Sequence, residues 1–405
     1  MQRRHFLATL GALTAASALP SKAAVQQPAA RQPAATTDDG PLLLGSPAVF
    51  APTASSLSIT VPLRAPAFVR IEHGPTPKLG NLTNGTPWGF VPHDDSVVKI
   101  TLADLPPGAR RHWRALLTPL NGGDTQSTPV YSHKTLDPSA PSTRFSVWND
   151  THDNAPTLRK LHSLLDPDDD FLLWNGDASN NINDPAIIAP TYVSPRGLNL
   201  ALAPAILFAR GNHDVRGRWA NKLNNHLAFP GNRPFCAFRS GPLAAILLDT
   251  GEDKPDAHPS FRGTAAFEPL IREQAAWLGN VIRQPEIRDA PYRVVFCHIP
   301  LRWTDETPPD YANKGFDHVS LRGRAAWEPA LLRWGVQLVI SAHNHRASRL
   351  PPSPRHPYTQ ILGGGPKLEA ATLMRCHADA SALRLTVTKI KDNSTVIEET
   401  LPPHA

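Results

Sequence analysis

The sequence is poor in cysteine and has no long basic run. Only three cysteines occur in 405 residues, which excludes a disulfide-rich scaffold and any cysteine-based zinc finger. No stretch beyond the first 24 residues is apolar enough to span a membrane. Basic residues are scattered, and the formal charge of +6 falls to about +3 without Arg3, Arg4 and Lys22, so a nucleic-acid partner is not expected.

Proline, in contrast, is abundant. The chain holds 43 prolines, roughly twice the usual share of about 5%. Because proline interrupts helices and central strands, we do not expect a helical bundle or a coiled coil. The 41% of apolar residues argues against complete disorder, and the length suits two domains. Residues 143–155, 168–184, 205–229 and 336–350 contain no proline, so regular strands can form there without interruption.

The N-terminus has the pattern of an export signal. A twin arginine, Arg3 and Arg4, precedes a weakly apolar run over residues 7–19, and small residues fit cleavage after Ala23. This resembles a twin-arginine (Tat) signal, which implies the Tat export machinery as a partner and a periplasmic or secreted protein. An ordinary signal peptide or a membrane anchor is the alternative, but the run is short and rich in Ala, Thr and Ser. Residues 24–41 lack apolar periodicity, and we expect a disordered linker there.

Residues 42–137 have the pattern of a small β domain. Short segments that alternate apolar and polar residues are separated by Gly, Pro and Asn turns, which predicts a β-sandwich. The stretch from Leu102 to Gly108, followed by Trp113, resembles the corner of a fibronectin type III domain, although Tyr usually stands where Trp113 does. The predicted strands are 56–61, 67–72, 96–102, 112–117 and 130–133.

Each of five apolar runs beyond residue 142 is followed at once by polar residues. Such runs predict buried strands, and open α/β sheets place their sites just past the carboxyl ends of buried strands. Carboxylate, amide and imidazole groups at these ends suit a metal site. The runs and motifs are 145–148 with Asn149-Asp150-Thr151-His152, 171–174 with Asn175-Gly176-Asp177, 205–209 with Arg210-Gly211-Asn212-His213-Asp214, 293–297 with His298, and 336–340 with Ser341-Ala342-His343-Asn344-His345.

Taken in order, these motifs resemble those of the calcineurin-like metallophosphoesterases over residues 142–400. The resemblance implies an α/β fold, a four-layer αββα sandwich, behind the small β domain. This domain order is similar to that of purple acid phosphatases. The implied function is hydrolysis of phosphomonoesters or phosphodiesters in a small phosphorylated substrate, by attack of a metal-bridging hydroxide. A non-catalytic binding or adhesion protein that retains the fold is the alternative, and a nuclease would need a basic channel.

The resemblance also implies a role for each motif residue. His213 is expected to stabilise the transition state and to protonate the leaving oxygen, while Asp214 either orients His213 or caps a turn. Nitrogen and oxygen ligands suit two ions of Fe, Mn, Zn or Co, so the metal stays open. The implied metal ligands are Asp150, His152 and His345 for the first ion, Asn212, His298 and His343 for the second, and Asp177 as the bridge between them.

The sequence departs from the family pattern at two positions. Purple acid phosphatases place Tyr three residues after the bridging Asp, and Asn180 stands there, so a tyrosinate-bound ferric ion is not expected. The last motif usually opens with Gly, and Ala342 stands there, which disfavours a positive φ. Whether Cys236 and Cys376 pair in an oxidising compartment is left open, because the distance between them does not follow from the sequence.

The substrate site is expected in the loops. Asn180, next to the bridging Asp, is a candidate substrate contact. Arg216 and Arg302 could clamp a phosphate or form ordinary ion pairs. The long segments 180–199 and 302–327 are expected to be lids. A terminal hairpin over residues 382–397 is expected to complete the second sheet of the sandwich.

Overall fold

The computed structural model describes residues 42–85, 96–120, 122–304 and 317–404. The predicted signal peptide (1–23) and linker (24–41) therefore lie outside the described residues. None of the helices within the described ranges is long and apolar enough to cross a bilayer.

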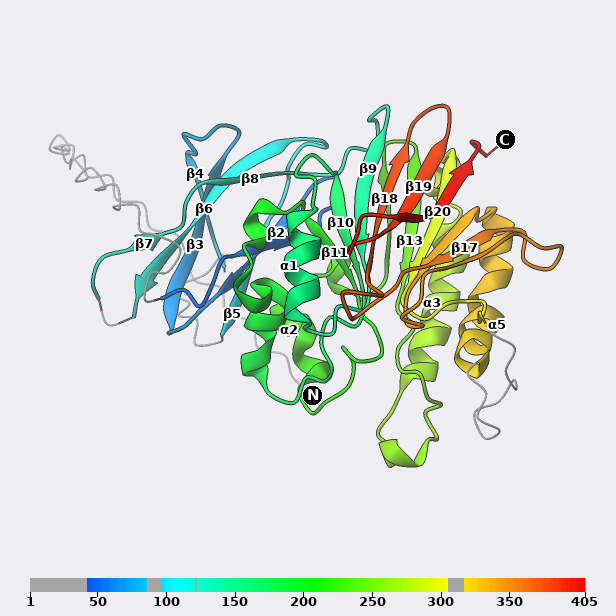
Figure 1. Cartoon of the computed structure of the whole chain (residues 1–405). Helices are drawn as coiled ribbons and strands as arrows, with labels where there is room; N and C mark the ends of the chain where they lie inside the picture. Colours follow the sequence, from blue (N-terminus) through cyan, green and yellow to red (C-terminus); the bar gives the residue numbers. More distant parts are fainter. Residues whose placement is uncertain (1–41, 86–95, 121, 305–316, 405) are drawn as a thin grey trace, which may run out of the picture. The chain divides into compact units, whose positions relative to one another are not determined.

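Two sheets form the body of the fold (Figure 1). Within the described residues, the first sheet has nine strands in the order β20-β19-β18-β9-β10-β11-β1-β2-β5. These strands are β1 (Ala48–Phe50), β2 (Leu57–Pro62), β5 (Val97–Leu102), β9 (Thr143–Trp148), β10 (Phe171–Asn175), β11 (Ile206–Ala209), β18 (Thr372–Ala378), β19 (Leu383–Lys389) and β20 (Thr395–Leu401).

The second sheet has the order β12-β13-β14-β15-β17-β16. Its strands are β12 (Cys236–Ser240), β13 (Leu243–Leu248), β14 (Tyr292–Cys297), β15 (Leu338–Ser341), β16 (Ser348–Leu350) and β17 (Thr359–Leu362). Strands β9, β10 and β11 are parallel in the first sheet, and β13, β14, β15 and β17 are parallel in the second.

Helices lie along the outer faces of the two sheets (Figure 1). Helix α1 begins where Asn154 accepts a hydrogen bond from the Thr157 N–H, with Pro156 in its first turn, a favourable start for a helix. The helices are α1 (Ala155–Ser163), α2 (Leu223–His226), α3 (Phe267–Val281), α4 (Pro285–Arg288) and α5 (Asp317–Trp334), with the short helices η1 (Pro185–Ile187), η2 (Ala189–Val193), η3 (Pro195–Gly197), η4 (Leu200–Leu202), η5 (Ala220–Lys222), η6 (Pro230–Asn232) and η7 (Pro259–Phe261).

Alternation along the strands explains why both faces of each sheet are apolar. In β10, Phe171 and Leu173 enter the core between the sheets, while Leu172 and Trp174 enter the core under α1. Strand β13 divides its residues in the same way between the central core and the core under α3 and α5. Because successive side chains point to opposite faces, a strand buried on both sides needs an unbroken apolar run. The predicted four-layer αββα fold is confirmed.

The N-terminal β segment is a sandwich that shares a sheet with the C-terminal α/β region. Its second sheet contains β3 (Ala67–Gly74), β4 (Asn81–Asn84), β6 (Arg110–Pro119), β7 (Gln126–Ser127) and β8 (Tyr131–Lys134). Its other strands, β1, β2 and β5, continue the nine-stranded sheet, because β1 pairs in parallel with β11 at Phe50 and Ile206. The buried Trp113 donates to the ring of His133 at 3.0 Å. The specific likeness to a fibronectin type III domain stays a prediction.

Two expectations about the chain need correction. The terminal hairpin of β19 and β20 joins the first sheet, not the second, because β18 pairs antiparallel with β9 and covers what would be an open edge. The segment 180–199 is not an open lid, because it folds into η1, η2 and η3 and buries Ile188, Tyr192 and Val193. Much of the other expected lid is helix α5, and its residues 305–316 lie outside the described residues.

Candidate metal centre

The predicted metal ligands meet where the strands of the two sheets end. Asp150 follows β9, Asp177 follows β10 and Asn212 follows β11 in the first sheet, whereas His298 follows β14 and His343 follows β15 in the second. Because parallel strands end at the same edge, motifs far apart in sequence come together.

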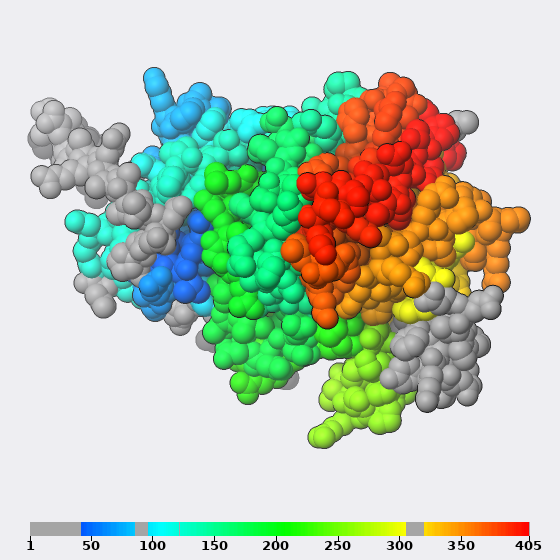
Figure 2. All heavy atoms as spheres, viewed as in Figure 1, coloured from blue at the N-terminus to red at the C-terminus, as the bar shows by residue number. Residues whose placement is uncertain are grey.

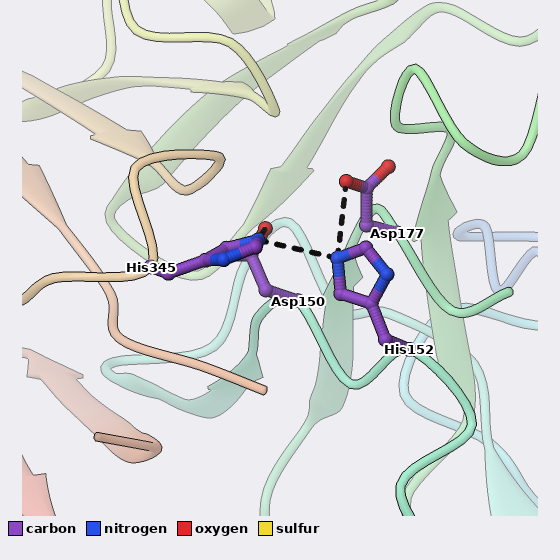
Figure 3. Close-up of side chains that lie close together, drawn as sticks. All are labelled: Asp150, His152, Asp177 and His345. Atoms are coloured by element: carbon purple, nitrogen blue, oxygen red, sulfur yellow. Dashed lines mark hydrogen bonds and ion pairs between the residues drawn. The ribbon is translucent and has the colours of Figure 1, made fainter. Parts of the chain in front are cut away.

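One group of side chains comprises Asp150, His152, Asp177 and His345 (Figure 3). One ligand atom from each residue can be chosen so that all of these atoms lie within 4.8 Å of one another. His152 Nε2 is 3.4 Å from Asp177 Oδ2 and 3.2 Å from His345 Nε2. His345 Nε2 is in turn 3.5 Å from Asp150 Oδ1. These atoms surround a position that one cation could occupy.

A second group shares Asp177 with the first. It comprises Asp177, His298 and His343. His298 Nε2 lies 3.2 Å from Asp177 Oδ2. Asn212 Oδ1 lies 2.9 Å from His343 Nδ1, which adds an amide oxygen to this group. Asp177 therefore contacts both groups, as a bridging carboxylate must.

In His298 and His152, the contact made by Nδ1 indicates which ring nitrogen can bind a metal ion. His298 Nδ1 faces the carbonyl oxygen of Asn175 at 2.9 Å, and a carbonyl can only accept, so Nδ1 carries the proton. His298 Nε2 is buried and has no hydrogen-bond partner among the described residues. His152 Nδ1 likewise faces Asn180 Oδ1 at 3.0 Å. In the neutral form, each ring therefore carries its lone pair on the Nε2 atom that faces Asp177, an arrangement that fits metal ions.

The electrostatics point the same way. Asp150 and Asp177 are both buried. Burial, together with the negative Asp177, raises the pKa of Asp150. Although burial opposes it, the pKa of His298 is raised by the nearby Asp177 and Asp150. Two buried carboxylates at close range require positive charge, which protons or metal ions can provide.

The backbone at the centre is strained. The φ angles are 43° for Asp150, 43° for His152, 51° for Asp177, 72° for His343 and 56° for His345. Left-handed conformations are uncommon for residues other than glycine, and they cluster at functional sites. Ala342 is not among the described residues with a positive φ. The missing glycine of the last motif is therefore tolerated, because the left-handed turn falls on the histidines.

Two glycines are required by close approach. A Cβ on Gly211 would lie 2.1 Å from Asp177 Oδ1, and a Cβ on Gly176 would lie 2.4 Å from His298 Nδ1. Gly176 also has a φ of 84°. Any side chain at either position would displace a predicted metal ligand.

His213 lies beside the first group, with its ring centroid 4.8 Å from that of His152. Its Nδ1 faces the carbonyl oxygen of Asn180 at 2.8 Å and therefore carries a proton. Its Nε2 lies 3.1 Å from Arg216 Nη1, from which the neutral ring accepts. Burial lowers the pKa of His213, with Arg216 adding to the effect and Asp177 opposing it. The ring is thus fixed from both sides at the edge of the centre.

Asp214 lies beneath the site. Its carboxylate accepts from the Tyr192 hydroxyl at 2.7 Å, from the Ser179 N–H at 3.2 Å and from the Gly211 N–H at 2.9 Å. Within the described residues it makes no hydrogen bond to the His213 ring. These contacts indicate a structural role, in which Asp214 connects the loop that carries Asp177 to the loop that carries Asn212. A catalytic role for Asp214 stays a prediction.

The three predicted substrate contacts have different surroundings. Asn180 touches His152 and His213 and lies at the centre. Arg216 also reaches His213, but Glu252 and Asp253 hold its guanidinium. Arg302 donates to the carbonyl oxygens of Pro351 at 2.9 Å and Tyr358 at 3.4 Å, on the connection between β16 and β17. The structure therefore brings Asn180 and Arg216 to the histidines and engages Arg302 elsewhere.

Acidic residues that follow β13 lie at the site and are not among the predicted site residues. Asp249 pairs with Arg210 at 2.6 Å, and Asp253 Oδ2 lies 3.4 Å from Asn212 Nδ2. The signal was present, because β13 is an apolar run that ends in Asp249-Thr250-Gly251-Glu252-Asp253. This run differs from the five motif-bearing runs because no histidine or asparagine follows it. The three cysteines are free and buried, so Cys236 and Cys376 do not pair.

Comparison with known families agrees with this geometry. A family model described as calcineurin-like phosphoesterase matches residues 143–347, which is about half of the chain. The chain belongs to the calcineurin-like phosphoesterase family. The matched range includes every predicted metal ligand from Asp150 to His345.

Solved structures share the fold of this calcineurin-like phosphoesterase. A purple acid phosphatase, PPD1, from yellow lupin (Lupinus luteus) seeds is 15% identical with a TM-score of 0.66, and the match covers 88% of this chain and 74% of that one. A structure of PhoD is 13% identical with a TM-score of 0.60, and the match covers 88% of each chain. No curated protein sequence matches this chain.

Proposed function

We propose that this protein is an exported, metal-dependent hydrolase of phosphoric esters. The observation that carries the proposal is the convergence of imidazole nitrogens on two buried carboxylates, with His213 at the edge of the group. Membership of the calcineurin-like phosphoesterase family supports it.

The proposed centre holds two divalent ions. Asp150, His152 and His345 would bind one ion, Asn212, His298 and His343 the other, and Asp177 both. Such ions supply Lewis acidity toward a phosphoryl oxygen and make a bound water more acidic. Mixed nitrogen and oxygen donors suit Fe, Mn, Zn or Co, with no thiolate to favour a softer metal.

Backbone N–H groups hold the two carboxylates in place. The His213 and His343 backbone N–H groups donate to the carboxylates of Asp177 at 2.9 Å and Asp150 at 3.1 Å. These bonds hold each carboxylate in place before any ligand arrives, which lowers the cost of assembling the site. His213 lies beside His152, and its two ring nitrogens are engaged by Asn180 and Arg216. A contact with a phosphoryl or leaving oxygen would require Nε2 to exchange Arg216 for the substrate.

Two substrate classes remain within the proposal, phosphomonoesters and phosphodiesters. The alternative, a binding or adhesion protein, gains no support from the site, because each predicted ligand of the pattern is retained. One assay distinguishes a hydrolase from a binding protein. Metal-free protein is reloaded with Mn²⁺, Zn²⁺ or Fe²⁺ and is then given p-nitrophenyl phosphate, bis-p-nitrophenyl phosphate and a panel of nucleotides. Turnover with metal, and its loss in Asp177→Asn, supports hydrolysis. Failure on all substrates with bound metal supports the binding protein.

We further propose Tat-dependent export to the periplasm or beyond. The support is the twin arginine at residues 3 and 4, the short apolar run and the small residues before position 24. Replacing both arginines by lysine should retain the protein in the cytoplasm, as measured by cell fractionation. Unchanged export would show that another route is used.

A further inference from the structure

The chain after β13 carries the acidic residues Asp249, Glu252 and Asp253, and part of the segment that follows stands out from the surface as a lobe (yellow-green in Figure 2). Asp253 contacts the predicted ligand Asn212, and both Glu252 and Asp253 accept from Arg216, which reaches His213. Glu252 has a side chain that is 2% exposed. Its backbone carbonyl accepts from Arg322 of α5 at 2.7 Å, which connects the segment after β13 to that helix.

Asp253 touches the predicted amide ligand. The Asn212 Nδ2 group donates to Asp253 Oδ2 at 3.4 Å, while Asn212 Oδ1 lies 2.9 Å from His343 Nδ1. An amide has one oxygen that can bind a cation and one nitrogen that cannot. A carboxylate on the nitrogen side therefore holds the oxygen toward the second metal position.

Arg216 links this carboxylate to His213. Its Nη2 donates to Asp253 Oδ1 at 2.7 Å and to Glu252 Oε1, its Nε donates to Glu252 Oε2 at 2.7 Å, and its Nη1 donates to His213 Nε2 at 3.1 Å. A guanidinium has about five N–H donors, and four are used in these contacts. A bidentate phosphate clamp by Arg216 would require some of these bonds to break.

We propose that Asp253 and Arg216 form a positioning pair: Asp253 sets the orientation of the Asn212 amide, and Arg216, held by Asp253 and Glu252, sets the orientation of the His213 ring. The proposal rests on the proposed function, because it assigns the pair to that same metal centre. Asp253 would support Asn212, a predicted ligand of the second metal ion, and Arg216 would support His213, which is expected to contact the substrate. Such supporting partners typically change metal affinity or activity by about 10- to 100-fold.

The test of Asp253 is metal binding. Mn²⁺ is titrated calorimetrically into metal-free wild type, Asp253→Ala, Asp253→Asn and the control Asp289→Asn, whose exposed carboxylate pairs with Arg288 at 2.6 Å. We expect Asp253→Ala to weaken one of two Mn²⁺ sites by about tenfold or more. Asp253→Asn retains a hydrogen-bond acceptor and the shape of the side chain, so its Mn²⁺ affinity should lie between those of wild type and Asp253→Ala. This variant also provides the test if Asp253→Ala does not fold. Asp289→Asn should match wild type.

The test of Arg216 is steady-state kinetics on bis-p-nitrophenyl phosphate. A positioning residue should lower kcat by about tenfold in Arg216→Lys with KM changed little, because lysine keeps the charge but not the fork. Raised KM with unchanged kcat would instead identify Arg216 as a direct phosphate contact and overturn its half of the proposal.

The two proposals fail in different ways. If wild type binds Mn²⁺ and cleaves the ester but Asp253→Ala and Asp253→Asn bind two ions with wild-type affinity, the role of Asp253 in the positioning pair is wrong and the proposed function stands. If wild type binds no Mn²⁺ and cleaves neither p-nitrophenyl phosphate nor bis-p-nitrophenyl phosphate, the proposed function is wrong. The proposal of a positioning pair is then wrong as well.

Discussion

The Nε2 atoms of His152 and His345 lie 3.2 Å apart (Figure 3). The Nδ1 atom of His152 is turned to Asn180 Oδ1, so in the neutral ring the lone pair is on Nε2, which faces His345. A cation held between these two nitrogens and the carboxylates of Asp150 and Asp177 would stabilise their close approach. A bound metal ion would also reduce the repulsion between the two buried carboxylates.

Metal binding should therefore stabilise the protein. A ligand that binds only the folded state at about 100 times its Kd adds roughly 2.7 kcal/mol. We expect Mn²⁺ to raise the Tm of wild type and to raise that of His345→Ala much less, by differential scanning calorimetry. His377→Ala is the matched control, because both side chains are 43% exposed. An equal rise in all three proteins would place the stabilising ion elsewhere.

Gly211 should be intolerant of the smallest side chain. Because a Cβ there would lie 2.1 Å from Asp177 Oδ1, Gly211→Ala should displace the bridging carboxylate. We expect metal affinity to fall by about 100-fold, at the upper end of what loss of a supporting contact costs, as measured by Mn²⁺ titration. The matched control is Gly279→Ala in α3, where no atom lies within 4 Å of the added Cβ. It should instead stabilise the helix by about 0.5–1 kcal/mol. Intact binding in Gly211→Ala would show that the loop yields.

The strands and the metal motifs could be predicted from the sequence because both depend on local order. An unbroken apolar run such as 171–174 is possible only where both faces of a strand are buried, and the ligands follow each run directly. The order of the motifs then identified the family. No part of this inference needed a distance between residues remote in sequence.

What the sequence could not provide depends on distant contacts. The link from Arg216 to Asp253 spans 37 positions, and nothing in either neighbourhood indicates it. The terminal hairpin was assigned to the wrong sheet because alternation specifies a strand but not its partner. The segment 180–199 has the sequence pattern of a loop, because its helices are short and interrupted by prolines, so the buried residues show no helical periodicity.

The hydroxyl of Tyr192 should be important for stability. It donates at 2.7 Å to the fully buried carboxylate of Asp214. Tyr192→Phe would leave that acceptor short of one bond, at a cost of about 1–3 kcal/mol. Tyr292→Phe is the matched control, because the Tyr292 hydroxyl is buried with no hydrogen-bond partner among the described residues. Urea denaturation should show a large loss for the first variant and little or none for the second; equal losses would contradict the assignment.

Asp169 should make stability depend on pH at a place remote from the metal centre. Burial raises the pKa of Asp169 from 3.8 to about 6, although its hydrogen bond from Ser146 at 2.6 Å opposes the rise. The folded state therefore holds the proton more tightly than the unfolded state. The stability that this group contributes is complete below pH 3.8 and is lost as the pH rises through about 6. Because a tenfold difference in proton affinity is equivalent to about 1.4 kcal/mol, the loss is roughly 3 kcal/mol at most.

Asp169→Asn should remove this pH dependence, because an amide still accepts from the Ser146 hydroxyl but never becomes charged. The gain in unfolding free energy over wild type should be small near about pH 4 and should grow to a plateau above about pH 7. Urea denaturation of metal-free protein across this range measures it, with Asp168→Asn as the control, because Asp168 is adjacent in sequence but exposed. A gain that is constant with pH would mean that Asp169 stays ionised in the folded state and that its burial is compensated by neighbouring charge.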